Sequence, residues 1–220
     1  FGLLGIWAVL AINGLIITVV GINPIITTLG TMTIVRGAAY ILTGGVSLYG
    51  VPTEFQWLGR EYVLEIPIPV IVMVIVFAIC YVGLNRTYLG RYVYAIGGNE
   101  EAARLSGIPV RRIKNIVYVI GGVTAGLSGI ILASRLGAGQ AASGTGFELD
   151  VITAVILGGV SIDGGQGKLQ GTLIGVLIIG ILSNGLTLMN VEPFYQLVIK
   201  GAALLLAVGL DRLRKQIAAS

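Results

Sequence analysis

Residues 85–114 read NRTYLGRYVYAIGGNEEAARLSGIPVRRIK, and they form the one long charged stretch of a chain that is otherwise almost continuously apolar. Six of the fourteen Lys and Arg residues lie in it. Within the stretch, Glu101-Ala102-Ala103 is followed by Gly107, which gives the spacing E-A-A-x-x-x-G. Because loops rich in Lys and Arg stay on the cytoplasmic side of a membrane, this stretch decides how the apolar segments around it are oriented.

The composition outside this stretch is that of a membrane protein. Of 220 residues, 55% are hydrophobic and 11% are charged, with a mean hydropathy of +0.95, whereas a soluble domain has about 25% charged residues. The 34 glycines have no Gly-X-Y period and lie inside apolar runs, as expected where transmembrane helices pack closely. The net charge of +4 comes from a few loops, which indicates contact with a lipid bilayer and argues against a nucleic-acid partner.

Two absences restrict the chemistry. The chain has no histidine, so imidazole bases, His-ligated metals and His proton relays are excluded. Its single cysteine, Cys80, lies in an apolar run and can form neither an internal disulfide nor a cysteine-built metal site. We therefore expect no catalytic residues, no metal site and no enzyme activity. The chain opens without an initiator Met or a signal peptide, and we expect it to be the C-terminal part of a longer protein.

A membrane span needs about 20 predominantly apolar residues. By that criterion the sequence predicts an all-α, polytopic transmembrane helix bundle with about seven membrane segments, in one domain that covers 1–220. The expected segments are 2–20, 25–46, 66–84, 115–133, 151–162, 169–190 and 194–210. Segment 151–162 is too short for a straight span and is broken by Gly158-Gly159, so we expect a broken or re-entrant piece there.

The distribution of basic residues predicts the orientation. With 85–114 placed as a cytoplasmic loop, ten of the fourteen Lys and Arg residues lie inside. Only Arg60 and Arg135 lie outside, and Arg36 and Lys200 lie in the membrane. This asymmetry satisfies the positive-inside rule and places the C-terminus in the cytoplasm.

The charged stretch also contains the signals of a short helix. Asn99 is a good N-cap, and Glu100 and Glu101 favour the positive N-terminal end of a helix. Gly107 followed by Pro109 ends it. About two helical turns are predicted, although an ordinary solvated connector would carry the same basic residues.

Polar residues inside membrane segments are the candidates for a translocation path, since facing them toward lipid is costly. Arg36 could donate hydrogen bonds to a substrate or pair with a neighbouring helix, and Lys200 could instead extend outward to the interface. The candidates for the path are Asn13, Thr27, Thr28, Arg36, Asn184, Gln196 and Lys200. Each of the uncharged ones could equally bridge two helices.

Four long segments carry a resemblance to a known family. They are INPIITTLGTMTIVRGAAYILTGG (22–45), GRYVYAIGGNEEAARLSGIPVRRIK (90–114), GTGFELDVITAVILGGVSIDGGQGKLQGTLIG (144–175) and FYQLVIKGAALLLAVGLD (194–211). Together they resemble the ribose, xylose and galactose branch of bacterial sugar ABC permeases. The I-x-L-P that follows the E-A-A-x-x-x-G spacing in many other ABC permeases is absent after Gly107.

The resemblance implies a permease subunit in the bacterial inner membrane that imports a monosaccharide. It implies a separate ATPase docking on 98–112, a soluble sugar-binding protein and a second permease copy, most simply in a homodimer. The residues implied to couple to the ATPase are Asn99, Glu100, Glu101, Ala102, Ala103, Arg104 and Gly107. ATP and Mg²⁺ would bind to the ATPase, and no cofactor would bind to this chain. Gly165-Gln166-Gly167-Lys168 resembles part of a P-loop, but residue 162 is Ile where the P-loop has its first Gly, and residue 169 is Leu where it has Ser or Thr.

Two alternatives remain. A branched-chain amino-acid ABC permease would have a similar architecture. An ion-coupled secondary transporter would carry a titratable group near mid-membrane, whereas the acids here, including Glu148 and Asp150, lie in loops or at span ends.

Overall fold

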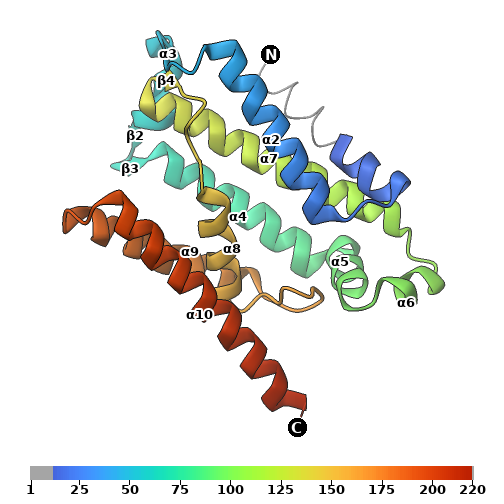
Figure 1. The fold of residues 1–220 in the computed structure, drawn as a ribbon. Coiled ribbons are helices and arrows are strands. Elements are labelled where there is room, and N and C mark those ends of the chain that lie inside the picture. Colours follow the sequence, from blue (N-terminus) through green and yellow to red (C-terminus); the bar gives the residue numbers. More distant parts are fainter. Residues whose placement is uncertain (1–11, 220) are drawn as a thin grey trace. The chain divides into compact units, whose positions relative to one another are not determined.

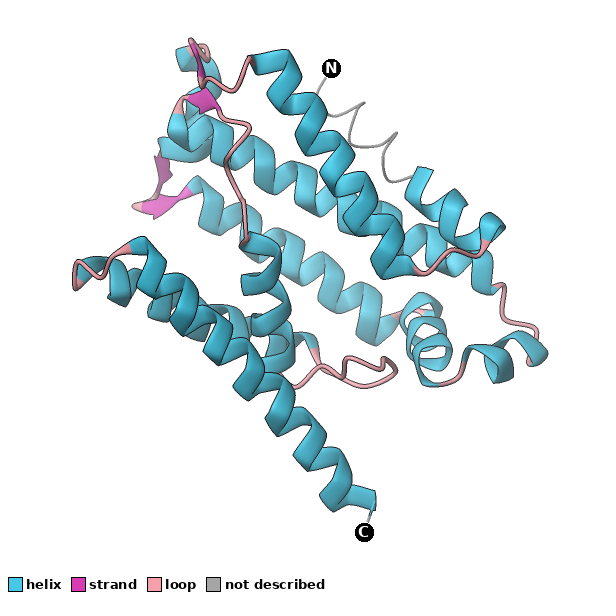
Figure 2. Ribbon diagram, in the orientation of Figure 1, coloured by secondary structure: helices cyan, strands magenta, loops and turns pink. Residues whose placement is uncertain are grey.

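The computed structural model describes residues 12–219, and within them the chain is almost entirely helical (Figure 1). In this range the strands are short, two residues each (Figure 2). Four helices are long and apolar enough to cross a membrane: α2 (Pro24–Thr43), α4 (Ile68–Arg86), α7 (Val110–Leu136) and α9 (Leu169–Leu188). The expected all-α polytopic bundle is confirmed.

Three of these helices match the expected segments to within three residues at each end, namely α2, α4 and α9. An asparagine and a proline explain the start of α2. The Asn23 side chain accepts a hydrogen bond from the Ile25 amide at 2.9 Å, and Pro24 occupies the first turn of α2. Of the first expected segment, residues 2–11 lie outside the described residues, and Ile16–Val20 form the π-helix η1.

Helix α7 is longer than the segment 115–133 predicted from hydropathy. It begins directly after Pro109, so it takes in Arg111, Arg112 and Lys114. Its 27 residues rise about 40 Å, against about 30 Å for the hydrocarbon core of a bilayer. The helix therefore continues into water at its charged end, where a hydropathy window no longer detects it.

A small polar assembly holds α3 (Thr53–Arg60) against the far end of α7. The Ser134 hydroxyl, which is fully buried, accepts from the Gly59 amide at 2.8 Å and donates to the Phe55 carbonyl at 2.7 Å. The chain also contains two antiparallel strand pairs. They are β1 (Leu48–Tyr49) with β4 (Ala138–Gly139), and β2 (Tyr62–Val63) with β3 (Ile66–Pro67).

The short helix α8 (Phe147–Leu157) packs against α9 and α10 (Pro193–Ala219). Its 11 residues rise about 16 Å, roughly half a bilayer core, as expected for a broken piece. It begins four residues before the expected 151–162, and it ends at Leu157 because the helix closes at Gly159. This glycine has φ +84°, and the amide of Val160 donates back to the Val155 carbonyl at 3.2 Å.

Close backbone contact fixes α8 on α9. A Cβ on Gly158 would lie 2.6 Å from the carbonyl carbon of Gly171, and a Cβ on Gly175 would lie 3.0 Å from the Gly158 amide nitrogen. Glycines at these positions allow the two backbones to approach to a distance that no other residue permits.

The chain divides into two compact units. Unit 1 consists of residues up to Val93 together with Ala103–Ser143, and unit 2 consists of Tyr94–Ala102 together with the residues from Gly144 onward. The chain passes from one unit to the other at three places: after Val93 in helix α5 (Tyr88–Gly98), after Ala102 in the short helix α6 (Glu100–Leu105), and after Ser143. The single permease domain expected over 1–220 stays a prediction.

Candidate functional site

The short helix predicted in the charged stretch is α6, and both of its predicted end signals are present. The Asn99 side chain accepts from the Ala102 amide at 2.9 Å, which is an N-cap bond. At the other end Gly107 has φ +82°, and the Ile108 amide donates to the Ala103 carbonyl at 3.1 Å. These two features make a Schellman closure that satisfies the last carbonyls of the helix.

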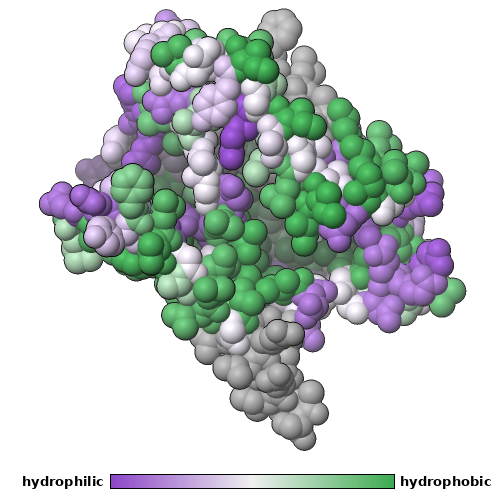
Figure 3. All heavy atoms as spheres, in the orientation of Figure 1, coloured by the Kyte–Doolittle hydropathy of each residue, from purple (hydrophilic) through white to green (hydrophobic). Residues whose placement is uncertain are grey.

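Six of the seven residues predicted to couple to an ATPase are exposed, and the exception is Ala103. Glu100, Glu101 and Arg104 are exposed, whereas Ala103 is buried. In Figure 3 hydrophilic residues gather where Figure 1 places α6, while hydrophobic residues cover much of the same face. The helix thus carries its charged side chains at the surface and packs against the protein through an alanine.

A helix that the sequence did not reveal precedes α6. Residues Tyr88–Gly98 form α5, which turns tightly out of α4: a Cβ on Gly90 would lie 2.7 Å from the Leu84 Cα. The stretch has three tyrosines, one arginine and three glycines and lies inside the charged segment 85–114, which was predicted to be a loop. The periodicity of its apolar positions is the signal that could have identified it.

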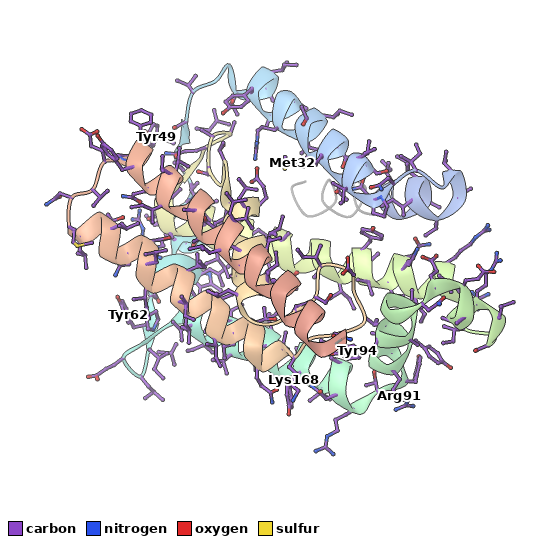
Figure 4. The ribbon with its side chains drawn as sticks, turned by 60° about the horizontal axis from the view of Figure 1, so that its bottom comes forward. Met32, Tyr49, Tyr62, Arg91, Tyr94 and Lys168 are labelled. Carbon is purple, nitrogen blue, oxygen red and sulfur yellow. The ribbon has the colours of Figure 1, made fainter. Side chains whose placement is uncertain are left out.

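An open pocket of about 430 Å³ lies in unit 1, within the usual size range of small-molecule sites. Its lining consists of Asn13, Thr28, Thr31, Met32, Val35, Arg36, Ala39, Gln140 and Ala141. Three predicted path residues, Asn13, Thr28 and Arg36, therefore converge on one pocket. Met32 of the same pocket is labelled in Figure 4.

Most of the pocket is one face of α2. Thr28, Thr31, Met32, Val35, Arg36 and Ala39 contribute to it from that helix. Their spacing of three and four residues is that of a helix face, so Thr31 could have been found from the sequence. Gln140 comes from a loop after β4, and no sequence pattern connects it to α2.

The polar groups of this pocket are available to a ligand. Asn13 is buried, and its Oδ1 accepts no hydrogen bond from the described residues. The hydroxyls of Thr28 and Thr31 donate to the Pro24 and Thr27 carbonyls, at 2.9 and 3.0 Å, which leaves lone pairs on both oxygens to accept.

Arg36 is the positively charged group of the pocket. It is half-buried, and among residues 12–209, whose side chains the structure describes, it makes no ion pair. A guanidinium has five N–H donors and no acceptor. The pocket therefore combines acceptors from Asn13 and the threonines with donors from Arg36, which suits a neutral molecule that carries hydroxyl groups.

The other predicted charge in a membrane segment, Lys200, is paired. Its Nζ lies 2.6 Å from Asp150 Oδ2 and joins α10 to the first turn of α8. Both residues line a cavity of about 290 Å³ in unit 2, together with Thr153. The sequence placed Asp150 at a span end but could not connect it with a residue fifty positions away.

The remaining path candidates line neither of these two pockets. Thr27 is buried and donates to the Asn23 carbonyl at 3.1 Å, Gln196 donates to the Val191 carbonyl at 2.9 Å, and Asn184 is exposed on α9. Among the side chains that the structure describes, those of residues 12–209, no group of three or more metal-ligating side chains comes together.

Comparisons with known proteins agree with the resemblance in the sequence. The chain is 52% identical to the ribose import permease of Bacillus subtilis over 91% of this chain and 63% of that protein. It is 46% identical to the ribose import permease of Escherichia coli K12 (93% and 65%) and 45% identical to the L-arabinose transport system permease of the same strain (93% and 62%). It thus spans less than two thirds of these relatives. No solved structure matches the chain.

These relatives are permeases, and the apolar helices of this chain are those of a multi-pass membrane protein. The family model described as branched-chain amino acid transport system / permease component matches residues 1–208. Because that match covers nearly the whole sequence, the chain belongs to this family of transport permeases.

Proposed function

We propose that this chain is the membrane-spanning permease part of an ATP-driven importer that carries a monosaccharide across a bacterial inner membrane. The observation that carries the proposal is the 52% identity to a ribose import permease, supported by 46% and 45% identity to permeases named for ribose and L-arabinose. The pocket of unit 1 supports it chemically, since its acceptors and its guanidinium can bind hydroxyl groups.

The energy in this scheme comes from other subunits. An ATPase that binds ATP and Mg²⁺ docks on 98–112, where α6 exposes two acids and one arginine. A soluble sugar-binding protein delivers the substrate on the opposite side, and a second permease copy completes the pore. Closure of the ATPases would move α6 as a rigid body and change the side to which the path opens.

The second candidate is a branched-chain amino-acid permease, because the description of the family model names that substrate. The lining of the unit 1 pocket disfavours it. A zwitterionic amino acid presents an ammonium group, and the lining residues include no carboxylate that could pair with it. An ion-coupled transporter is disfavoured as well, since Asp150, an acid in the first turn of α8, is engaged by Lys200.

Uptake by the reconstituted importer tests the proposal. The natural permease is placed in proteoliposomes with its ATPase and binding protein, and labelled pentoses, hexoses and leucine are offered with and without ATP. We expect ATP-dependent accumulation of one monosaccharide and none of leucine. Accumulation of leucine would establish the second candidate, and accumulation by the permease alone on an ion gradient would establish a secondary transporter.

The coupling role of α6 has its own test. Reversing Glu100, Glu101 and Arg104 together should abolish uptake and ATPase binding while membrane insertion stays normal, because the surface charges that meet the ATPase are inverted. The matched control reverses Glu54 and Glu61, which are also exposed but belong to the opposite side of the predicted topology. Normal uptake by the triple variant would remove the coupling role.

The proposed orientation places α6 and the C-terminus in the cytoplasm. Labelling of single cysteines by an impermeant thiol reagent measures this directly. A cysteine at Arg104 should be protected in intact cells and one at Glu61 should be labelled. The reverse pattern would overturn the orientation and the docking site with it.

A further inference from the structure

The segment from α5 to α6 is joined along the chain to unit 1 at both ends. Before it, α4 and the first half of α5 belong to unit 1, and after it Ala103 leads through Pro109 into α7 of the same unit. Residues Tyr94–Ala102 nevertheless belong to unit 2. A force applied to this segment can thus reach α8, α9 and α10 through non-covalent contacts in unit 2, without passing along the main chain of unit 1.

Those contacts are made by backbone against backbone. A Cβ on Gly97 would lie 3.0 Å from the Gly165 Cα, and a Cβ on Gly165 would lie 2.6 Å from the Gly98 Cα. A Cβ on Gly164 would lie 2.9 Å from the Gly97 carbonyl oxygen. Gly97 of α5 and Gly164 and Gly165 of the loop therefore touch so closely that none of these three positions has room for a side chain.

One side chain adds a directional bond to this contact. The Tyr94 hydroxyl donates to the Gly167 carbonyl at 3.0 Å from the same face of α5. Figure 4 labels Tyr94 on α5 and Lys168, the next residue after Gly167 in the loop. We call the set Tyr94, Gly97, Gly164, Gly165 and Gly167 the glycine clasp.

The loop side of the clasp is itself a closed turn. The Ser161 amide donates to the Gln166 carbonyl at 3.0 Å, and the Gly164 amide donates to the Ser161 carbonyl at 3.2 Å. Gly164, Gly165 and Gly167 have φ of +90°, +71° and +144°, which L side chains rarely adopt. The turn runs directly into Lys168, the residue before α9, so a displacement of the turn is passed to that helix.

We propose that the glycine clasp transmits the movement of α6 to the α8–α9–α10 bundle, so that its members are positioning residues that couple ATP hydrolysis to transport. The proposal rests on the proposed function. It gives a role to Gly164–Lys168, a glycine-rich sequence that resembles a phosphate-binding loop without being one. The loop serves as the receiving surface of a mechanical contact, and its glycines are needed for close approach.

Adjacent glycines of α5 provide a matched pair of variants. A Cβ on Gly97 meets the backbone of Gly165, whereas a Cβ on Gly98 meets nothing within 4 Å. Both positions tolerate alanine in the helix itself, so Gly97→Ala and Gly98→Ala differ only in their effect on the clasp. Tyr94→Phe removes the hydrogen bond and changes no volume that the turn occupies.

The measurement is the ratio of sugar molecules imported to ATP molecules hydrolysed, in proteoliposomes that contain the natural permease, its ATPase and its binding protein. For Gly97→Ala we expect the ratio to fall about tenfold, with ATPase binding and hydrolysis retained. For Tyr94→Phe we expect a fall of about two- to fivefold, as for loss of one hydrogen bond. Gly98→Ala should keep the wild-type ratio.

The outcomes separate the two levels of inference. If the wild-type importer moves no monosaccharide with ATP, the proposed function fails before the clasp is considered. If the wild type transports but Gly97→Ala and Tyr94→Phe keep the wild-type ratio of import to hydrolysis, the clasp is not a coupling element. This includes the case in which both rates fall in equal proportion. If Gly97→Ala does not insert into the membrane, the ratio measured for Tyr94→Phe alone decides whether the clasp is a coupling element.

Discussion

Two regions of this protein handle polar groups at membrane depth in opposite ways. In the pocket of unit 1, Asn13 and Arg36 have no partners among the described residues. In unit 2, Lys200 is held by Asp150, and α8 is locked on α9 by glycines. Polar groups without partners cost stability and persist where a ligand uses them, whereas paired charges contribute to specific packing. We infer that unit 1 carries the polar binding surface and unit 2 the rigid element.

The largest expected effect is a loss of stability when Gly175 of α9 is replaced. A Cβ there would collide with the Ala154 carbonyl and lie 3.0 Å from the Gly158 amide nitrogen, all of it backbone. We expect Gly175→Ala to lower the unfolding free energy by about 3 kcal/mol, measured by thermal unfolding in detergent. Gly180→Ala, with open space around its Cβ, is the control. Equal stability of the two variants would show that α8 is not locked.

The next largest expected effect is the loss of stability on breaking the Lys200–Asp150 ion pair of unit 2. Lys200→Met leaves the Asp150 carboxylate partly buried without its partner, and we expect a loss of about 2 kcal/mol. The double variant Asp150→Asn, Lys200→Met removes both charges and should recover most of that loss. If Lys200→Met is as stable as the wild type, the pair contributes nothing and Lys200 returns to the list of path candidates.

In unit 1 the expected pattern is reversed. Arg36→Ala should reduce uptake about tenfold with ATPase docking and thermal stability unchanged, because no ion pair with a described side chain, those of residues 12–209, is lost. Arg36→Lys keeps the charge but loses the planar set of donors, so its uptake should be intermediate. An unaffected transport rate in Arg36→Ala would assign this residue to structure instead.

The smallest expected effects are those of replacing Asn13, for which stability and uptake should change in opposite directions. Replacing a buried acceptor that has no partner by an apolar residue of similar size is neutral or stabilising, so Asn13→Leu should raise stability by up to about 1 kcal/mol. Uptake should fall about threefold, as for loss of one hydrogen bond to the sugar. A clear loss of stability would show that the Asn13 amide has a structural partner.

Much of this architecture was readable from the sequence. Hydropathy identified α2, α4 and α9 almost to their ends, and Asn99 and Gly107 identified α6. The sequence failed where a helix leaves the bilayer, as at Arg111 in α7, since charge there ends the apolar signal without ending the helix.

The candidate sites were readable only along one helix. Thr28 and Arg36 share a face of α2 by their spacing, but Asn13 and Gln140 reach the same pocket through tertiary contact. Asp150 and Tyr94 went unrecognised as partners of Lys200 and Gly167 for the same reason. Sequence periodicity reports neighbours within a helix and carries no information on which helices meet.

The two closed ends of α6 have a consequence for assembly. A six-residue peptide is too short to stay helical alone in water, yet here the Asn99 cap and the Ile108 to Ala103 bond hold the helix before any partner arrives. An ATPase would therefore meet a preorganised ligand, and the conformational entropy of ordering these residues would not weaken its affinity.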